Sequence, residues 1–362
     1  MKSHISGAVL AMAILSLSVS CNKLAADHDD ASFIEAPNEC SGSVRFRITG
    51  CGTPATKASG VTATSAETAV SDVQILIFDS NGNVVSYIDA GTSMTAVAKL
   101  KQGDYKARAV INGPDLSGTK TLPATEATGI ALADWNSPSS DFVMGNVAAV
   151  SLSVEMNKDT ELDIDVSRFV SRVRLMSVAN GCPAALGGII LKRAFLSNSV
   201  CNQNLAGTAA PSDWSNIYGR SSISNRNSVI DGASFTAVPA GLTYYAWNGG
   251  QSVAAGSSVS PARSFYSYPN PSSDSVTAWK STFSETAPRL VLVAEVNGND
   301  FYYPVALPGM ERNCTYDVSV SITGEGLDDP QGDISVLKEK GTVNASITIL
   351  PWTEGTEYKL EY

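Results

Sequence analysis

The side chains that most often carry catalysis are scarce in this chain, and the histidines show it most clearly. The 362 residues include only His4 and His28, both near the N-terminus. A Ser-His-Asp or Cys-His nucleophile, or a His-ligated metal, therefore has no histidine available from residue 29 onward. We expect no catalytic residue, no metal site and no cofactor, and we do not expect an enzyme.

Paired carboxylates are the catalytic arrangement that remains without histidine. Four acidic residues alternate with apolar ones in the sequence "DTELDIDV": Asp159, Glu161, Asp163 and Asp165. This alternation is typical of the solvated face of a half-buried strand, which we favour over a catalytic or calcium site. The sequence "DSNGN" at 79–83 has some features of a calcium loop. Its place between two strand patterns favours a β-hairpin turn at Asn81-Gly82 instead.

The first cysteine, Cys21, directly follows a short apolar N-terminal segment. One Lys precedes the apolar run at 5–19, and small residues end that run, so we predict a secretory signal peptide over residues 1–20. The junction is similar to a bacterial lipobox, although Ser18 stands where Leu is usual. We therefore expect acylation of Cys21, with palmitate for example, and membrane attachment through that lipid alone. The alternative is an ordinary signal peptide followed by an incidental cysteine.

Five further cysteines follow: Cys40, Cys51, Cys182, Cys201 and Cys314. An exported protein can form disulfides, and Cys182 and Cys201 are close enough in sequence to join one loop. The odd number leaves the pairing open.

The charge of the chain excludes some partners. Its net charge is −10 at pH 7, with 25 basic and 35 acidic residues. No basic stripe is present to neutralise phosphates, so we expect no nucleic-acid partner and no polybasic contact with lipid.

Strand patterns recur along most of the chain, with runs rich in Gly, Ser, Asn and Pro between them. The predicted strands are 73–78, 84–88, 105–111, 148–156, 169–178, 188–196, 290–296, 301–306, 316–322, 343–350 and 357–362. Helical periodicity is scarce, and a short helix is expected only at 124–135. These patterns predict an all-β protein, most simply two β-sandwiches at 58–160 and 161–362. The long loops at 202–287 carry Tyr and Trp that serve either recognition or loop packing.

The two ends of the chain carry interchangeable strand patterns. In "SVRFRITG" the apolar residues Val44, Phe46 and Ile48 alternate with charged or polar ones, and a small-residue segment with Lys57 follows. At the C-terminus the alternating apolar residues are Tyr358, Leu360 and Tyr362. If the first strand were removed after synthesis, the last strand of another copy could fill its place and build an open filament. The alternative is that both are ordinary edge strands of their own domains.

Several stretches together resemble the fimbrillin family, the type V pilus subunits of Bacteroidetes. They are "VSDVQILIFDSNGNVVSY", "FVMG", "SRFVSRVRL", "FYSYPN", "FYYPVAL", "ERNCTYDVSVSITGEG" and the terminal "ILPW", in the family's order. The resemblance implies two transthyretin-like β-sandwiches, export as a lipoprotein, and cleavage after a basic residue by a trypsin-like or Arg-specific protease. That cleavage removes the first strand and permits polymerisation by strand exchange.

Carried over to this chain, the resemblance places lipidation at Cys21, a propeptide at 21–57 and the cleavage junction at Lys57-Ala58. The family's best-known members have Arg at that junction, so a strictly Arg-specific protease would not process this chain as it does its relatives. The resemblance implies a stalk subunit that binds other copies of itself or related pilins and serves cell adhesion. Its precursor would be an outer-membrane lipoprotein, and its mature form would lie in extracellular fimbriae. The alternative is a non-polymerising surface lipoprotein or tip adhesin that binds a glycan, host protein or bacterial surface ligand through the 202–287 loops.

Overall fold

The computed structural model describes residues 33–34, 41–50, 65–132, 141–200, 202–208, 217–218, 246–273, 287–327, 343–351 and 358–361. All of them belong to one compact unit, Ala31–Tyr362. The predicted signal peptide and Cys21 lie outside these residues. Among the described residues, no helix is long and apolar enough to cross a membrane.

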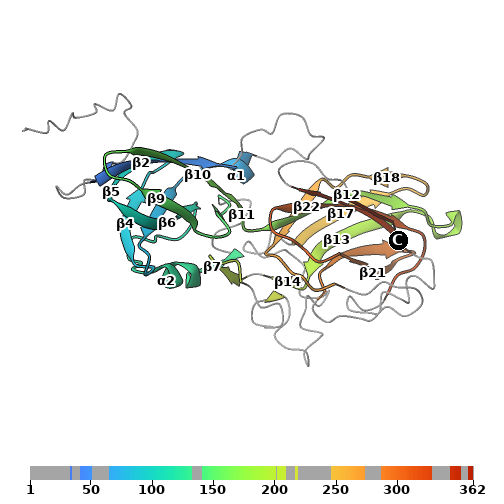
Figure 1. The fold of residues 1–362 in the computed structure, drawn as a ribbon. Coiled ribbons are helices and arrows are strands. Elements are labelled where there is room, and N and C mark those ends of the chain that lie inside the picture. Colours follow the sequence, from blue (N-terminus) through green and yellow to red (C-terminus); the bar gives the residue numbers. More distant parts are fainter. Residues whose placement is uncertain are drawn as a thin grey trace, which may run out of the picture. The chain divides into compact units, whose positions relative to one another are not determined.

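The N-terminal half forms two facing sheets (Figure 1). The first sheet has four strands in the order β1-β5-β2-β10: β1 (Phe33–Ile34), β5 (Thr95–Lys101), β2 (Ser41–Thr49) and β10 (Asp159–Asp165). The second has the order β11-β8-β6-β3-β4, with β9 also paired to β6. Its strands are β11 (Ser167–Arg168), β8 (Met144–Gly145), β6 (Gly103–Ile111), β3 (Val73–Phe78), β4 (Val84–Asp89) and β9 (Val150–Val154).

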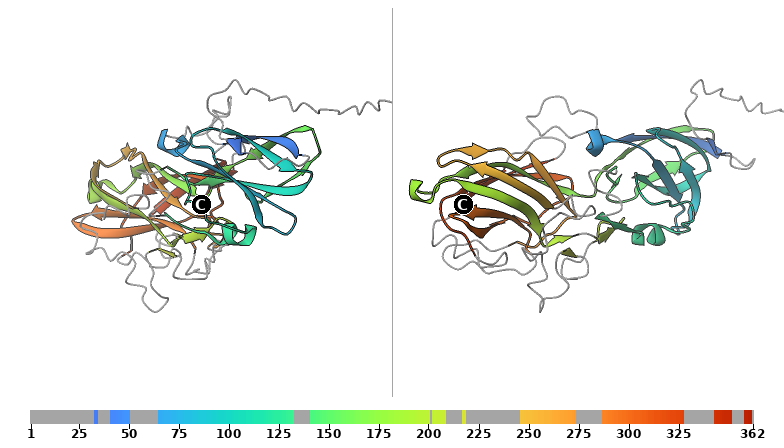
Figure 2. Two further views of the ribbon diagram at one scale, coloured as in Figure 1. Left: turned by 90° about the vertical axis from the view of Figure 1, so that its left-hand side faces the viewer. Right: turned by 180° about the vertical axis from the view of Figure 1, so that it is seen from behind.

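The C-terminal half also forms two main sheets, whose layers are visible in both views of Figure 2. The six-stranded sheet has the order β18-β12-β22-β23-β24, with β19 also paired to β12. Its strands are β18 (Ser258–Val259), β12 (Ser171–Asn180), β22 (Cys314–Ile322), β23 (Val343–Pro351), β24 (Tyr358–Glu361) and β19 (Arg263–Ser267). The four-stranded sheet consists of β17 (Ala246–Val253), β13 (Ile189–Ser197), β20 (Arg289–Val296) and β21 (Asn299–Ala306).

The described remainder consists of short elements. Two small ribbons pair β14 (Ser199–Val200) with β16 (Ile217–Tyr218) and β15 (Asn202–Asn204) with β7 (Gly129–Ala131). The helical elements are α1 (Ser65–Thr68), α2 (Leu122–Ala127) and the 3-10 turn η1 (Ala184–Leu186). The expected all-β fold is confirmed.

The apolar alternation predicted from the sequence is visible in the burial of the strands. In β3 all six residues are buried, because this strand covers a core on each side. Val73, Ile75 and Ile77 pack into the core between the two N-terminal sheets, where Val44 and Phe46 of β2 meet them. Leu76 and Phe78 face the other way and join the larger apolar cluster that fills the C-terminal sandwich.

Two expectations changed at the level of elements. The helix expected at 124–135 begins at Leu122, capped by the Thr121 hydroxyl, and ends at Ala127. Thr128 is extended and the chain continues as the strand β7 (Gly129–Ala131), so the expected helix is wrong at 128–131. The last part of that prediction, 133–135, lies outside the described residues. Three strands of five or more residues were also missed, β5, β17 and β19, as were the strands of two or three residues. The buried residues of β5 include two alanines, and β17 contains two glycines, so neither has a strong strand pattern.

The strand pairing bears on the predicted domain boundary near residue 160. Described strands up to β11 pair with one another, and those from β12 onward do likewise, except that β15 pairs with β7. The predicted boundary falls inside β10, which pairs with β2. The division into 58–160 and 161–362 stays a prediction.

Candidate functional site

The first strand pattern forms β2, an inner strand of the first sheet. Its residues alternate in burial, and Val44, Phe46 and Ile48 are 0%, 0% and 6% exposed. Burying each such side chain stabilises the fold by about 1.5–3 kcal/mol. The expected strand and its apolar face are therefore confirmed, whereas its removal stays a prediction.

Both edges of β2 are hydrogen-bonded to neighbouring strands. It runs antiparallel to β5, from the pair Ser41–Lys101 to the pair Arg47–Thr95. It runs parallel to β10, from the pair Ser43–Asp159 to the pair Thr49–Asp165. We call the position between β5 and β10 the β2 site.

The two neighbours of β2 depend on it for their own pairing. In the described part of the chain, β10 pairs only with β2, and β5 pairs only with β2 and the two-residue strand β1. Both β1 and β2 precede Lys57 in the sequence. Loss of residues 1–57 would therefore remove two of the four strands and leave the other two without a partner in this sheet.

The outward face of the β2 site is acidic on the β10 side. Arg47 donates from Nε to Asp163 Oδ1 at 2.7 Å and from Nη2 to Asp163 Oδ2 at 3.0 Å. Its Nη1 also lies 3.6 Å from Glu161 Oε2, within ion-pair distance. The hydrogen bonds from Arg47 hold the pKa of Asp163 below its usual value, and those same bonds raise the pKa of Arg47. All three side chains are about half exposed, so the pairs add little stability. The predicted solvated face of this strand is confirmed.

Two glycines mark the ends of the β2 site. A Cβ on Gly42 would lie 2.5 Å from the carbonyl oxygen of Glu155 and 2.7 Å from Val154 Cγ1. Gly50 has φ +86°, and a Cβ there would meet Asp165 and the carbonyl of Val166. A side chain is therefore excluded at positions 42 and 50, and the positions from 43 to 49 between them accept side chains.

The segment that contains Lys57 and Ala58 is hydrogen-bonded at its two ends to the backbone of Val166 and to the side chain of Arg168. At its start, Val166 N donates to Thr49 O at 2.9 Å. At its end, Arg168 Nε donates to Glu67 O at 2.8 Å. Lys57 and Ala58 lie outside the described residues. The two anchors, Val166 and Arg168, are two residues apart, so the cleavage junction belongs to a connection whose two ends are both fixed at one place.

A buried ion pair holds the far end of this connection. The Glu67 carboxylate accepts two hydrogen bonds from Arg172 Nη1, at 2.8 and 2.7 Å, and one from the Tyr266 hydroxyl at 2.7 Å. Glu67 is 1% exposed. Burial of Tyr266, with Glu67 beside it, raises the pKa of the tyrosine. Glu67 could not be recognised from the sequence, because no motif marks a single acid in a four-residue helix.

The predicted donor strand forms β24 at the edge of the six-stranded sheet. It pairs antiparallel with β23, with Tyr358 opposite Ile349 and Leu360 opposite Ile347. Tyr362 lies outside the described residues. In this structure β24 therefore pairs within its own chain and lies at the end of the sheet order, beyond β23.

Other sequence predictions have separate outcomes. The turn at Asn81-Gly82 is confirmed: Gly82 has φ +80°, and Asp79 accepts from the backbone N–H of Asn81 and Asn83. Those backbone hydrogen bonds lower the pKa of Asp79. Cys182 is a buried thiol that donates to Ile322 O at 3.5 Å. The possible Cys182–Cys201 disulfide stays a prediction. Cys201 lies outside the described residues.

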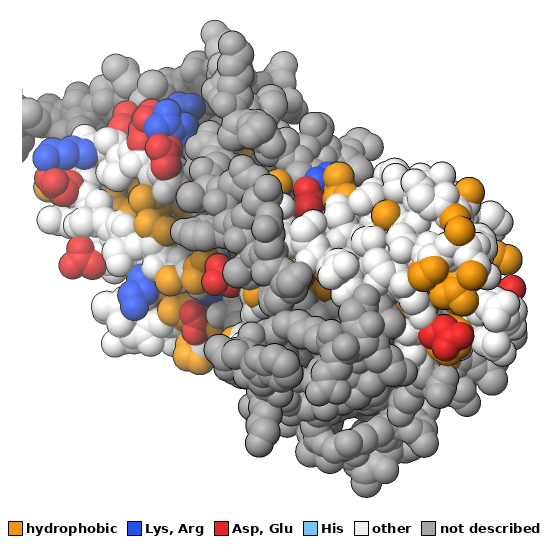
Figure 3. Space-filling model, turned by 90° about the vertical axis from the view of Figure 1, so that its right-hand side faces the viewer, with side chains coloured by type: hydrophobic (Ala, Val, Ile, Leu, Met, Phe, Trp, Pro, Cys, Tyr) orange, Lys and Arg blue, Asp and Glu red, His pale blue; other side chains and the backbone are white. Residues whose placement is uncertain are grey.

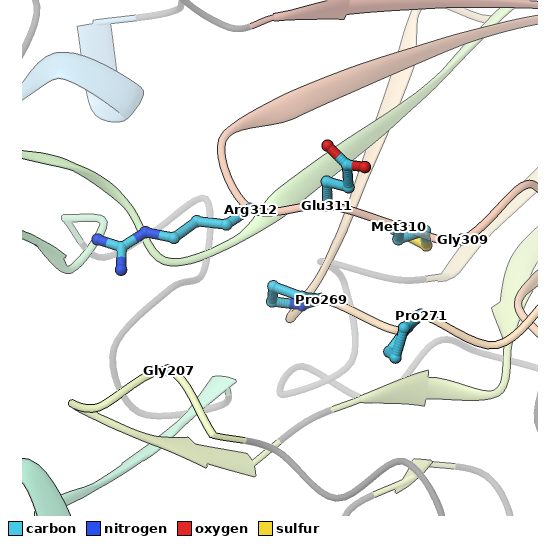
Figure 4. A pocket seen from close by; sticks show the side chains of 7 residues that line it. All are labelled: Gly207, Pro269, Pro271, Gly309, Met310, Glu311 and Arg312. Carbon is cyan, nitrogen blue, oxygen red and sulfur yellow. The ribbon is translucent and has the colours of Figure 1, made fainter. Parts of the chain in front are cut away.

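A pocket is lined in part by described residues of the 202–287 segment, which is expected to carry recognition. It has a volume of about 460 Å³ and is lined by Gly207, Pro269, Pro271, Gly309, Met310, Glu311 and Arg312. Figure 4 shows the Arg312 side chain extending away from Glu311 and Met310. Its guanidinium donates to the carbonyl oxygens of Arg168 and Ser167 at 2.9 and 2.7 Å. Arg312, the cation among the lining residues, therefore hydrogen-bonds to the backbone.

One face of the molecule carries few charged side chains over part of its described surface. Figure 3 shows few red or blue atoms, and mainly white and hydrophobic (orange) ones, among the described atoms on the right of that view. The low charged fraction of the sequence, 17%, agrees with this appearance.

Comparisons with known proteins place this fold. The sequence model of the major fimbrial subunit protein (FimA) family matches residues 42–168, which confirms the resemblance over that part of the chain. The fold is similar to a fimbrilin from Porphyromonas gingivalis, with a TM-score of 0.57, 15% identity, and coverage of 88% of this chain and 99% of that one. A protein from Parabacteroides distasonis assigned to cell adhesion gives a TM-score of 0.59, 14% identity, and coverage of 88% and 99%. No curated protein sequence matches the chain.

Proposed function

We propose, from the match of residues 42–168 to the major fimbrial subunit family, that this chain is a pilin that matures by proteolysis and polymerises by strand exchange. Cleavage after Lys57 removes β1 and β2. The C-terminal strand of another copy then fills the β2 site. Each subunit donates to one neighbour and accepts from another, so the contact is open and builds a filament.

The observation that carries this proposal is the dependence of β5 and β10 on strands that precede Lys57. In the described residues neither strand has a sheet partner beyond β1 and β2. After cleavage, two strand edges and an apolar layer would face water, which is unfavourable unless another strand enters. An ordinary edge strand could be lost with far less effect, because it has one neighbour.

The cleavage junction is suited to a protease in position and sequence. Small residues and one proline surround Lys57, and the flanking anchors at Thr49 and Glu67 are hydrogen-bonded to Val166 and Arg168. A cut between two fixed ends leaves the body of the protein folded. A trypsin-like protease accepts Lys57 directly.

The same proposal includes the export of the precursor and the final location of the mature protein. The precursor is exported, acylated on Cys21 and held at the outer membrane through that lipid. Cleavage after Lys57 frees the mature chain from its anchor and allows it to enter extracellular fimbriae that serve adhesion. The C-terminal strand favours a stalk position, because a stalk subunit needs a strand to donate.

Limited trypsin treatment of the purified precursor tests the proposal. Intact mass should show a mature chain that starts at Ala58 and still ends at Tyr362, and a gel run without boiling should show a ladder of oligomers. A chain that is cut after Lys57 and remains monomeric would contradict polymerisation. It would favour a surface lipoprotein that binds a ligand through its loops.

A further inference from the structure

The charges around the β2 site are arranged in a fixed pattern. Each outward position of β2 lies opposite an acid of β10: Ser43, Arg45, Arg47 and Thr49 pair with Asp159, Glu161, Asp163 and Asp165 respectively. On the other side, Ser43 pairs with Lys99 of β5, whereas Arg45 and Arg47 pair with the uncharged Val97 and Thr95. An incoming strand therefore meets acids along one edge and a lysine near one end.

The segment 357–362 also has a fixed charge pattern, Glu-Tyr-Lys-Leu-Glu-Tyr. Its three apolar residues alternate with Glu357, Lys359 and Glu361. When the apolar residues face the core, the three charged residues occupy the outward positions. The direction and register of entry then decide which acid Lys359 faces.

The segment 357–362 could occupy the β2 site in several registers and in either direction, and we call each combination a placement. Most placements are excluded, because they leave a buried apolar position of β2 empty or put a side chain at Gly42. Any placement that puts Tyr358 or Tyr362 at position 42 is blocked by the backbone of Glu155. Two placements fill all three apolar positions, 44, 46 and 48. In the forward placement Tyr358 replaces Val44, and in the reverse placement Tyr362 does so.

Charge distinguishes these two placements. In the forward placement Lys359 lies opposite Glu161, which is a favourable pair. Glu357 lies opposite Asp159, but Lys99 of β5 is on its other side and offsets the repulsion. Only Glu361, opposite Asp163, faces an acid with no lysine beside it. In the reverse placement Lys359 takes the position of Arg47, opposite Asp163. Glu361 and Glu357 then face Glu161 and Asp165, and neither glutamate is beside Lys99, so this placement has two uncompensated Glu–acid pairs where the forward one has a single pair. A forward placement shifted by two residues also puts glutamates opposite Glu161 and Asp165, and it leaves position 44 to Thr356. Opposite charges across a strand pair stabilise it and like charges destabilise it.

We propose that the β2 site selects its incoming strand by charge, and that the segment 357–362 of a second copy enters in the direction of β2 with Lys359 in the place of Arg45. This proposal rests on the proposed strand exchange and specifies its register. Cleavage removes Arg45 and Arg47, which lie opposite acids of β10, and Lys359 then restores one positive charge at the position of Arg45. Pairing is limited to six residues, because Gly42 excludes the side chain of Thr356 and the chain must diverge there.

Charge reversals at two acids of β10 test the register, because the alternatives predict opposite effects. Precursors with Glu161→Lys or Asp163→Lys are cleaved with trypsin, intact mass confirms loss of only residues 1–57, and the growth of the ladder is timed. In the proposed register Glu161→Lys repels Lys359 and slows assembly about threefold to tenfold. Asp163→Lys removes the repulsion of Glu361 and accelerates assembly. The matched control is Asp104→Lys on β6 in the other sheet, which should leave the rate unchanged.

A charge swap completes the test. Lys359→Glu alone should slow assembly, and combining it with Glu161→Lys should restore the rate. If Glu161→Lys accelerates assembly while Asp163→Lys slows it, Lys359 faces Asp163 and the proposed register is wrong. If neither change alters the rate, selection by charge is wrong, while strand exchange stands. Only a wild-type chain that is cleaved and forms no ladder contradicts strand exchange itself.

Discussion

At the scale of single residues, neighbouring positions of β2 have very different energetic weights. Phe46 is fully buried between the two N-terminal sheets, whereas the side chain of Arg47 is about half exposed. Burial of apolar area stabilises a fold strongly, and an exposed ion pair adds little. The apolar face therefore holds β2 in place, and the charged face determines which strand fits there.

The substitution Phe46→Ala should destabilise the precursor by about 3–5 kcal/mol, because it leaves a cavity in a packed core. The substitution Arg47→Ala should change the free energy of unfolding by less than about 1 kcal/mol. Urea unfolding of the uncleaved precursor measures both. An equal effect of the two substitutions would contradict the assigned roles of the two faces.

The pKa of Asp163 should depend on whether β2 is present. In the precursor, hydrogen bonds from Arg47 lower this pKa, so the pair stabilises the fold above the carboxyl's usual pKa and its contribution is lost as pH falls through the lowered value. Cleavage removes Arg47, and the pKa should rise toward its usual value. NMR titration of a chain lacking residues 358–362, before and after cleavage, measures the change. An unchanged pKa would show that Arg47 does not cause the shift.

The buried Glu67 should matter more than a comparable exposed acid. Removing one partner of a buried ion pair leaves the other charge uncompensated, which costs about 3–5 kcal/mol. Glu67→Ala should therefore destabilise the chain strongly. The matched change Glu155→Ala, at an acid that pairs with Lys158 and whose pair is exposed on both sides (62% and 64%), should cost much less. Chemical unfolding compares the two variants, and similar losses would contradict the anchoring role of Glu67.

At the scale of elements, the connection between β2 and α1 controls maturation. Lys57→Ala should block cleavage at this junction and leave the precursor folded, since β2 stays in place. Lys57→Arg should preserve cleavage by trypsin and allow cleavage by an Arg-specific protease. N-terminal sequencing of the products measures both outcomes. Removal of β2 from the Lys57→Ala variant under the same conditions would place the junction elsewhere.

Much of the element order could be predicted from the sequence, because alternation is a local signal. The stretch at 44–50 became a strand with the expected buried face, and Asn81-Gly82 became a turn. The pairing of β2 with β5 and β10 could not be predicted, because strand neighbours far apart in sequence leave no local signal. For the same reason the buried contact between Glu67 and Arg172, 105 residues apart, was missed.

At the scale of the whole molecule, this is an all-β protein in which two strands of one four-stranded sheet, β1 and β2, belong to the N-terminal segment that we propose is removed. The four-stranded sheet is complete only while β1 and β2 are present, and its two remaining strands come from well-separated parts of the sequence. Polymerisation would make each subunit's stability depend on its neighbour.

The most direct measurement of this account is amide hydrogen exchange in β10, followed through three states of the protein. The amides of Asp159–Asp165 that bond to β2 should be protected in the precursor. They should lose protection after cleavage of a chain lacking residues 358–362, and regain it in the polymer of the cleaved full-length chain. Protection that persists in the cleaved, truncated chain would contradict the dependence of β10 on β2. Protection that never returns in the polymer would show that no strand refills the β2 site.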